Sequence, residues 1–139
     1  MFTARNKKYR FILYNGPAIG FALLIFVMSS FPGYKLPTLG FQFSDKFVHT
    51  LEFGLFGIFL YRAFRYSTFF TRPYLFTILA GLPYAALDEF HQLYVPGRFS
   101  SVGDFAADSV GILLFAGISA LVNPKKKENS AANAEKPEY

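Results

Sequence analysis

The sequence predicts an all-α protein, an integral membrane bundle of four transmembrane helices with both termini in the cytoplasm. Of its 139 residues, 53% are hydrophobic and 20% aromatic, while 17% are charged, which is too apolar for an average soluble domain. Four separate stretches are also long and apolar enough to cross a hydrocarbon core, which takes about 20 residues of helix. We therefore expect the lipid bilayer as the environment of this chain.

The first two predicted helices differ in their polar content. The first covers residues 11–28 (FILYNGPAIGFALLIFVM), where Asn15 is the one strongly polar residue. The second covers residues 47–64 (FVHTLEFGLFGIFLYRAF) and is interrupted by His49 and Glu52. Basic residues before an apolar run also begin a signal peptide, but no small-x-small cleavage site follows the first helix. We therefore expect the first helix to remain uncleaved.

The remaining two helices complete a single membrane domain. The third runs from residue 73 to about residue 94, and the fourth covers residues 105–122. The sequence thus divides into a basic cytoplasmic N-terminus at 1–10, a transmembrane domain at 11–122 and a tail at 123–139. The tail combines a proline, a lysine run and Asn, Ala and Glu without apolar periodicity, which predicts a disordered cytoplasmic segment.

Positive charges predict the orientation, because lysine and arginine accumulate in cytoplasmic loops. They gather before the first helix, between the second and third, and after the fourth: Arg5, Lys7, Lys8, Arg10; Arg62, Arg65, Arg72; Lys125, Lys126, Lys127, Lys136. The other two loops carry fewer cations. Both termini should therefore be cytoplasmic. The same distribution explains the net charge of +5 without a nucleic-acid partner, and we expect none.

Polar residues gather at the outer ends of the helices in this orientation. Asp45, His49 and Glu52 follow one another at i, i+4 and i+7, which puts them on one face of the second helix. Asp104 opens the fourth helix and Asp108 follows one turn later. Two helices therefore offer acidic groups to the same outer region.

The third helix adds adjacent carboxylates at the same level. Asp88, Glu89 and Gln92 lie where the helix exits, and Arg98 lies in the loop that follows. An acidic residue at mid-bilayer costs about 2.5 to 3.5 kcal/mol on insertion scales, so these groups should face the bundle or a water-filled pocket. Arg98 is the expected counter-charge, because its planar fork can hold a carboxylate with two hydrogen bonds.

Simpler interpretations exist for part of this set. Asp45 and Asp104 stand where helix caps or first-turn acids belong, and His49 alone is typical of a bundle histidine with a satisfied hydrogen bond. Two or three carboxylates with His49 could also bind a divalent cation, but the sequence has no HExxH motif or similarly spaced ligand pair. We therefore assign no metal ligand and expect no cofactor. The absence of cysteine excludes disulfides, thiolate metal sites and cysteine nucleophiles.

Three motifs in order resemble a known family. DKFVH at residues 45–49, DEFHQLYVPGR at 88–98 and DFAADSVG at 104–111 are similar to D-K-x-x-H, D-E-x-x-Q-x-x-x-P-G-R and D-x-x-x-N-x-x-G. That series is the pattern of the VanZ-like family of small bacterial membrane proteins, and the resemblance spans about residues 11–121. It implies a multi-pass protein of the bacterial cytoplasmic membrane. The founding member is associated with low-level teicoplanin resistance, but the resemblance implies no known reaction.

Two residues depart from the family pattern. Asp108 stands where the family usually has asparagine, which adds a negative charge to an already acidic region, so this carboxyl should be protonated or paired. Phe115 stands where a further small residue is common, which should alter only the packing. The resistance role need not transfer to this chain.

The first functional hypothesis is an envelope protein that binds or chemically alters a lipid-linked or cell-wall group at the outer leaflet. Asp88 and Glu89 would act as acid, base or anchor, and His49 would shuttle a proton. Lys46 and Arg98 would hold an anionic head group. The complete set of candidate ligand-binding residues is Asp45, Lys46, Glu52, Gln92, Arg98, Asp104 and Asp108.

The second hypothesis is a membrane module without catalytic activity, whose function lies in a partner complex. In that case Asp88, Arg98 and Asp104 form a structural ion network that holds the loops. Proton-coupled transport is a third and weaker hypothesis, because no acidic residue lies near the cytoplasmic side and no relay across the membrane is visible. Whether the chain is an enzyme, and its oligomeric state, stay open at this point.

Overall fold

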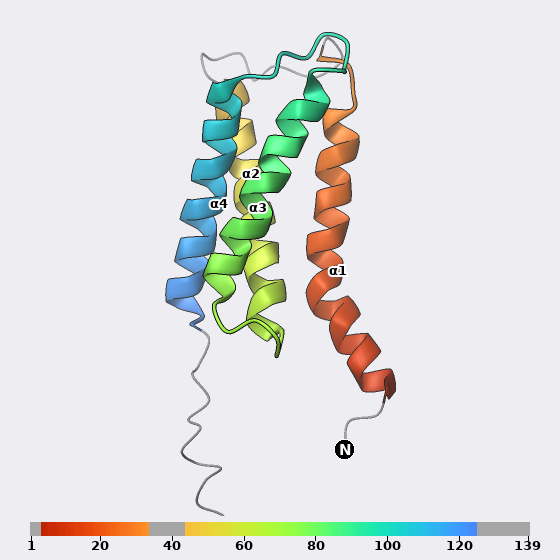
Figure 1. The fold of residues 1–139 in the computed structure, drawn as a ribbon, viewed down its shortest axis with the longest axis vertical. Coiled ribbons are helices and arrows are strands. Elements are labelled where there is room, and N and C mark those ends of the chain that lie inside the picture. The colour runs from red at the N-terminus through yellow and green to blue at the C-terminus, as the bar shows by residue number, and fades with distance from the viewer. Residues whose placement is uncertain (1–3, 34–43, 125–139) are drawn as a thin grey trace, which may run out of the picture.

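The computed structural model describes residues 4–33 and 44–124, which form four α-helices and, within those ranges, no strand (Figure 1). The helices are α1 (Ala4–Ser29), α2 (Ser44–Tyr66), α3 (Pro73–Gln92) and α4 (Val102–Val122). This confirms the all-helical class, and one helix covers each predicted apolar stretch. The predicted disordered tail lies outside the described residues from residue 125 onward.

The first helix begins earlier than the sequence predicts. Its apolar run starts at residue 11, but α1 already begins at Ala4. The intervening segment is rich in lysine and arginine, which are good helix formers, so the helix extends beyond its apolar part.

Three of the helices are long and apolar enough to cross a membrane: Tyr9–Ser29, Asp45–Tyr66 and Val102–Val122. By length and composition, the chain is that of a multi-pass membrane protein. Helix α3 is not among the three, because Asp88, Glu89 and Gln92 at its C-terminal end lower its mean hydropathy. Its 20 residues still give a length of about 30 Å.

Helices α2 and α4 share the most extensive helix contact of the bundle. Gly111 of α4 lies directly against the backbone of α2, so that a Cβ atom there would overlap the carbonyl oxygen of Thr50. One turn further along α2, a Cβ on Gly54 would lie 2.9 Å from the ring of Phe115. Small residues thus bring these backbones together, as is common between helices in lipid. The ring of Phe115 occupies the space that a side chain on Gly54 would need.

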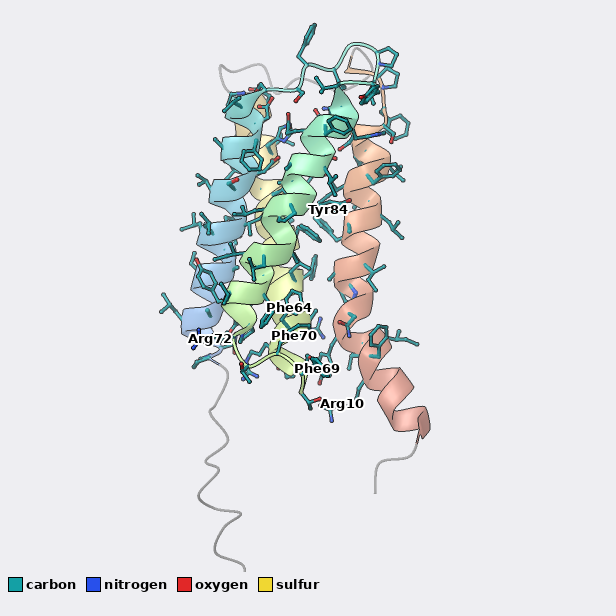
Figure 2. The ribbon with its side chains drawn as sticks, viewed as in Figure 1. Arg10, Phe64, Phe69, Phe70, Arg72 and Tyr84 are labelled. Atoms are coloured by element: carbon teal, nitrogen blue, oxygen red, sulfur yellow. The ribbon has the colours of Figure 1, made fainter. Side chains whose placement is uncertain are left out.

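A small apolar core lies in the middle of the bundle, built from Ile25, Phe53, Phe56, Ala85 and Ile112. Helix α1 packs against one side of this core, and the side chain of Tyr84 extends from α3 toward α1 (Figure 2). The Tyr84 hydroxyl donates a hydrogen bond of 2.6 Å to the carbonyl oxygen of Ala22. Many large apolar side chains, Leu23 and Leu79 among them, are exposed on the outside, as expected for a lipid-facing surface.

The two ends of the bundle have opposite character. The start of α1, the end of α4 and the connection between α2 and α3 lie together at one end (Figure 1). Arg10 and Arg72 lie there (Figure 2), and we call it the basic end. The start of α2, the end of α3 and the start of α4 lie at the other end, where the acidic side chains lie.

The close contact of α2 with α4 predicts that Gly111→Ala destabilises the protein. The added methyl group would overlap the backbone of α2, and overpacking of this kind costs about 1 to 3 kcal/mol. Thermal unfolding of the purified protein in detergent measures the effect. Gly20→Ala is the matched control, because nothing lies within 4 Å of its Cβ position. Equal melting temperatures for the two variants would contradict this packing.

Candidate functional site

Buried polar side chains gather where α2, α3 and α4 meet at one end of the bundle. Five of them are less than a tenth exposed: Asp88, Glu89, Gln92, Asp104 and Asp108. Together with Lys46 and His49 of α2 they form what we call the polar end cluster. Such a concentration of charged groups at the end of an apolar bundle is costly unless each group has a partner, so the contacts of each residue are decisive.

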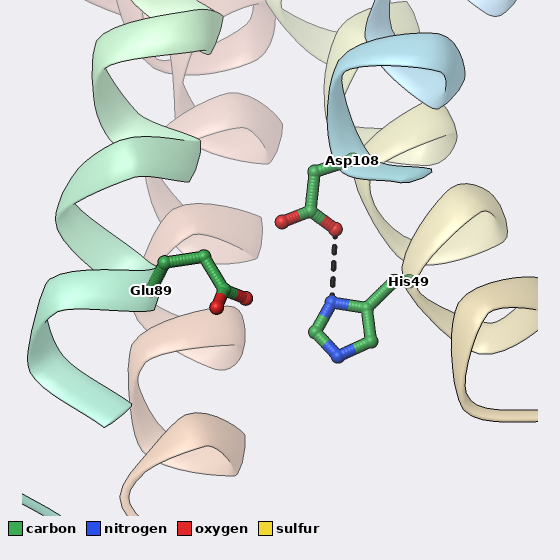
Figure 3. A group of neighbouring side chains, drawn as sticks. All are labelled: His49, Glu89 and Asp108. Atoms are coloured by element: carbon green, nitrogen blue, oxygen red, sulfur yellow. Dashed lines mark hydrogen bonds and ion pairs between the residues drawn. The ribbon is translucent and has the colours of Figure 1, made fainter. Parts of the chain in front are cut away.

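His49 and Asp108 form the centre of the cluster (Figure 3). The Nδ1 atom of His49 lies 2.9 Å from Oδ1 of Asp108, which joins α2 to α4. The Asp108 side chain is completely buried, and that of His49 is 12% exposed. The other carboxylate oxygen of Asp108, Oδ2, has no hydrogen-bond partner in the described part of the chain.

Glu89 reaches the same place from α3. Its Oε2 atom accepts a hydrogen bond of 2.9 Å from the backbone N–H of Ser101, at the start of α4. Its Oε1 atom is buried and has no partner among the described residues. Figure 3 shows the carboxylate of Glu89 facing Asp108 and the imidazole of His49. Two unpaired carboxylate oxygens therefore lie in one buried space beside a histidine.

Asp88 and Gln92 form a second contact on α3. The side-chain amide of Gln92 donates a hydrogen bond of 2.8 Å to Asp88, one helical turn away. Gln92 is 2% exposed, so this hydrogen bond lies in the interior of the bundle. Glu52 lies one turn beyond His49 on α2 and is half-buried.

Lys46 neutralises the carboxylate that opens α4. Its ammonium lies 2.5 Å from Asp104 and 3.2 Å from Asp45. Asp45 itself is largely exposed, with 63% of its side chain accessible. Ser101 also caps α4, because its hydroxyl accepts a hydrogen bond from the N–H of Asp104 and donates one to the Asp104 carboxylate. Asp104 is thus an acid of the first turn, next to the cap residue Ser101, and it also joins α2 to α4 through Lys46.

Arg98 is predicted to pair with a carboxylate, but within the described part of the chain it contacts none. Its guanidinium donates to the carbonyl oxygens of Met28, at 3.1 Å, and Phe31, at 3.4 Å. Carbonyl groups at the C-terminal end of a helix have no partner within the helix and carry the negative end of its dipole. The end of α1 therefore attracts the guanidinium, and Arg98 holds α1 to the loop between α3 and α4.

The loop that carries Arg98 depends on two glycines. Gly97 adopts a φ of 74°, a left-handed conformation that favours glycine. A Cβ on Gly33 would overlap the carbonyl oxygen of Gly97, and the N–H of Gly33 donates to the carbonyl of Pro96 at 3.2 Å. The backbone after α1 thus packs directly on the loop, which fixes the position of Arg98.

The structure brings together most of the residues that the sequence nominates. Asp45 and Arg98 are the exceptions: Asp45 is exposed, and Arg98 binds backbone carbonyls. The contact between Ser101 and Glu89 is a feature that the sequence analysis misses. It is made by a backbone N–H, which every residue except proline has, so no sequence signal could reveal it.

A family model described as VanZ/LLP1 matches residues 8–123, which include all three motifs and nearly all of the four helices. The chain belongs to this VanZ-like family. The resemblance seen in the motifs is thereby confirmed. No curated protein and no solved structure matches the chain.

A separate cavity of about 600 Å³ lies at the basic end of this VanZ-like chain. It is lined by residues of α1, α2 and the loop after α2, with Arg10, Tyr14 and Phe64 among them. Its lining contains neither a carboxylate nor an imidazole, so it has none of the acid–base groups of the polar end cluster. We therefore regard the polar end cluster, and not this cavity, as the candidate functional site.

The contact between Lys46 and Asp104 predicts a measurable coupling between α2 and α4. Lys46→Met and Asp104→Asn should each lower the free energy of unfolding, and the double variant should lose less than their sum. Because about a third of the Lys46 side chain is exposed, we expect a coupling of about 0.5 to 1 kcal/mol. Denaturation in detergent measures it. Strictly additive losses would mean that the two side chains do not interact.

Proposed function

We propose that the chain spans the bacterial cytoplasmic membrane four times, with both termini in the cytoplasm and the polar end cluster at the outer face. The length of about 30 Å supports α3 as the fourth crossing. The start of α1 and the end of α4 lie at the same end of the bundle, as an even number of crossings requires (Figure 1). Arg10, Arg62, Arg65 and Arg72 near that end support a cytoplasmic location for it.

We further propose that the polar end cluster binds or chemically modifies a cell-envelope group, either lipid-linked or part of the cell wall. The supporting observation is a pair of buried oxygens beside His49, Oε1 of Glu89 and Oδ2 of Asp108, which have no hydrogen-bond partner among the described residues. Groups of this kind can accept a hydrogen bond or a proton from a bound molecule. Glu89 and His49 would then carry acid–base chemistry, with Asp88 close by.

The contacts of the cations narrow the chemistry of that group. Lys46 is bound by two carboxylates and Arg98 by two carbonyl oxygens. The sequence predicts that Lys46 and Arg98 hold an anionic head group, but both cations already have partners within the protein. Carboxylate oxygens recognise hydroxyl or amino groups instead, and such groups are abundant in sugars and amino sugars. A contribution to glycopeptide resistance of the teicoplanin type stays a proposal that rests on the family alone.

One set of contacts favours the alternative, a membrane module without catalytic activity. Lys46 joins α2 to α4 through Asp104, and Glu89 joins α3 to α4 through Ser101. These contacts alone would hold three helices in register, so that the role of the chain would lie in a partner complex. The two proposals predict different activities in cells for variants of the cluster that fold normally.

Glu89→Gln separates the two proposals in cells. The amide keeps the size of the side chain and an oxygen for Ser101, but it removes the negative charge. If the cluster is a functional site, cells with this variant should lose protection against teicoplanin-type envelope stress although the protein reaches normal membrane levels. His91→Gln is the control, because His91 contacts Ser30 and Phe26 and is not part of the cluster. Loss of protection only in step with protein level would support the structural module instead.

The orientation can be tested because the chain has no native cysteine. Phe99→Cys and Phe69→Cys provide a matched pair, since both phenylalanines are more than 85% exposed and lie in loops at opposite ends. A membrane-impermeant thiol reagent should label Cys at position 99 in intact cells and Cys at position 69 only after permeabilisation. The reverse pattern would overturn the proposed orientation.

A further inference from the structure

His49, Glu89 and Asp108 have an arrangement that suits a metal ion. One nitrogen of His49 and one oxygen from each carboxylate all lie within 4.8 Å of one another. Ligands of a tetrahedral zinc ion lie about 3.4 Å apart, given bonds of about 2.1 Å. The 2.9 Å between Nδ1 of His49 and Oδ1 of Asp108 is a hydrogen bond and is shorter than that, so a bound ion would replace it and these two atoms would move apart.

The unpaired oxygens are the second argument for an ion. Asp108 is 0% and Glu89 6% exposed, and each has one oxygen without a hydrogen-bond partner among the described residues. Both carboxylates face the space beside the imidazole (Figure 3). Two buried carboxylates with only partial hydrogen bonding are expensive, since a buried charge needs a partner. A divalent cation would match their combined charge of minus two.

We propose that His49, Glu89 and Asp108 bind a divalent first-row transition-metal ion, with zinc as the best match. The imidazole favours this class over magnesium and calcium, which prefer oxygen ligands alone. The inference goes beyond the proposed function, because binding of the ion requires no envelope group. Three protein ligands would also leave a coordination position open, as in catalytic zinc sites.

The surroundings of the three residues support the role of ligands. The N–H of Ser101 holds Oε2 of Glu89 and leaves Oε1 directed into the site. Fixing one oxygen in this way is how neighbouring groups orient metal-binding carboxylates. The three ligands come from three different helices, so a bound ion would join α2, α3 and α4 at one point.

Zinc binding by the purified, full-length protein tests the inference. The protein is prepared in detergent without a histidine tag, stripped with a chelator and titrated with zinc against a chromophoric zinc indicator. We expect about one equivalent of tightly bound zinc per chain and a higher melting temperature with zinc. His49→Gln, Glu89→Gln and Asp108→Asn should each weaken the affinity on the order of tenfold or more. His91→Gln is the matched histidine control, because His91 contacts Ser30 outside the cluster, and it should leave the affinity unchanged.

Asp108→Asn is the most informative variant. Asparagine keeps the shape of the side chain, so the variant should fold. The inference is overturned if folded wild-type protein shows no saturable zinc binding, or if the three ligand variants bind zinc as tightly as the wild type. The zinc titration and the cell assay give independent results. Saturable zinc binding by a protein whose Glu89→Gln variant still protects cells would support this inference and contradict the envelope proposal.

Discussion

Asp108 has no exposed surface, and a carboxylate in such a place is tolerable only with a partner brought to it by another part of the chain. His49 of α2 is that partner, at 2.9 Å. The contact requires α2 and α4 to lie very close together, which Gly111 allows by having no side chain where it meets Thr50. The need of buried Asp108 for a partner and the absence of a side chain on Gly111 together determine how α2 and α4 pack at this end of the bundle.

The position of α3 follows from the same end. Glu89 can reach the His49–Asp108 contact because the start of α4 offers it the N–H of Ser101, immediately before the first turn of that helix. The loop between α3 and α4 then extends the assembly to α1, since Arg98 binds the carbonyl oxygens at the end of that helix. Every helix is therefore tied to the polar end. The opposite end is held by aromatic packing, such as the stacked rings of Tyr14 and Tyr66, and by hydrogen bonds from Tyr61 and Arg65 to the carbonyl oxygen of Asn123. Burial, more than the number of charges, makes the polar end the chemically distinct part of this chain.

Much of this could be predicted from the sequence, because lipid leaves few alternatives to helices. Apolar stretches of the right length predict the four helices, and the spacing of Asp45, His49 and Glu52 indicates one polar face. The partners could not be predicted, since helix rotation and backbone contacts have no sequence signal. Arg98 shows the difficulty: a carboxylate is the expected partner by charge, but its guanidinium binds the carbonyl oxygens of Met28 and Phe31 at the end of α1. The contact of Glu89 with a backbone N–H is equally invisible in the residue types.

The central claim is that His49 and Asp108 meet in the interior of the bundle, and nitrogen NMR of the imidazole tests it most directly. The chain has two histidines, and His91 contacts Ser30 and Phe26 instead, so it provides an internal reference. With histidine labelled by nitrogen-15 in detergent, Asp108→Asn should shift the ring resonances of His49 and leave those of His91 in place. If the His49 resonances in wild type and Asp108→Asn coincide, the two side chains are not in contact and the proposed centre of the cluster is wrong.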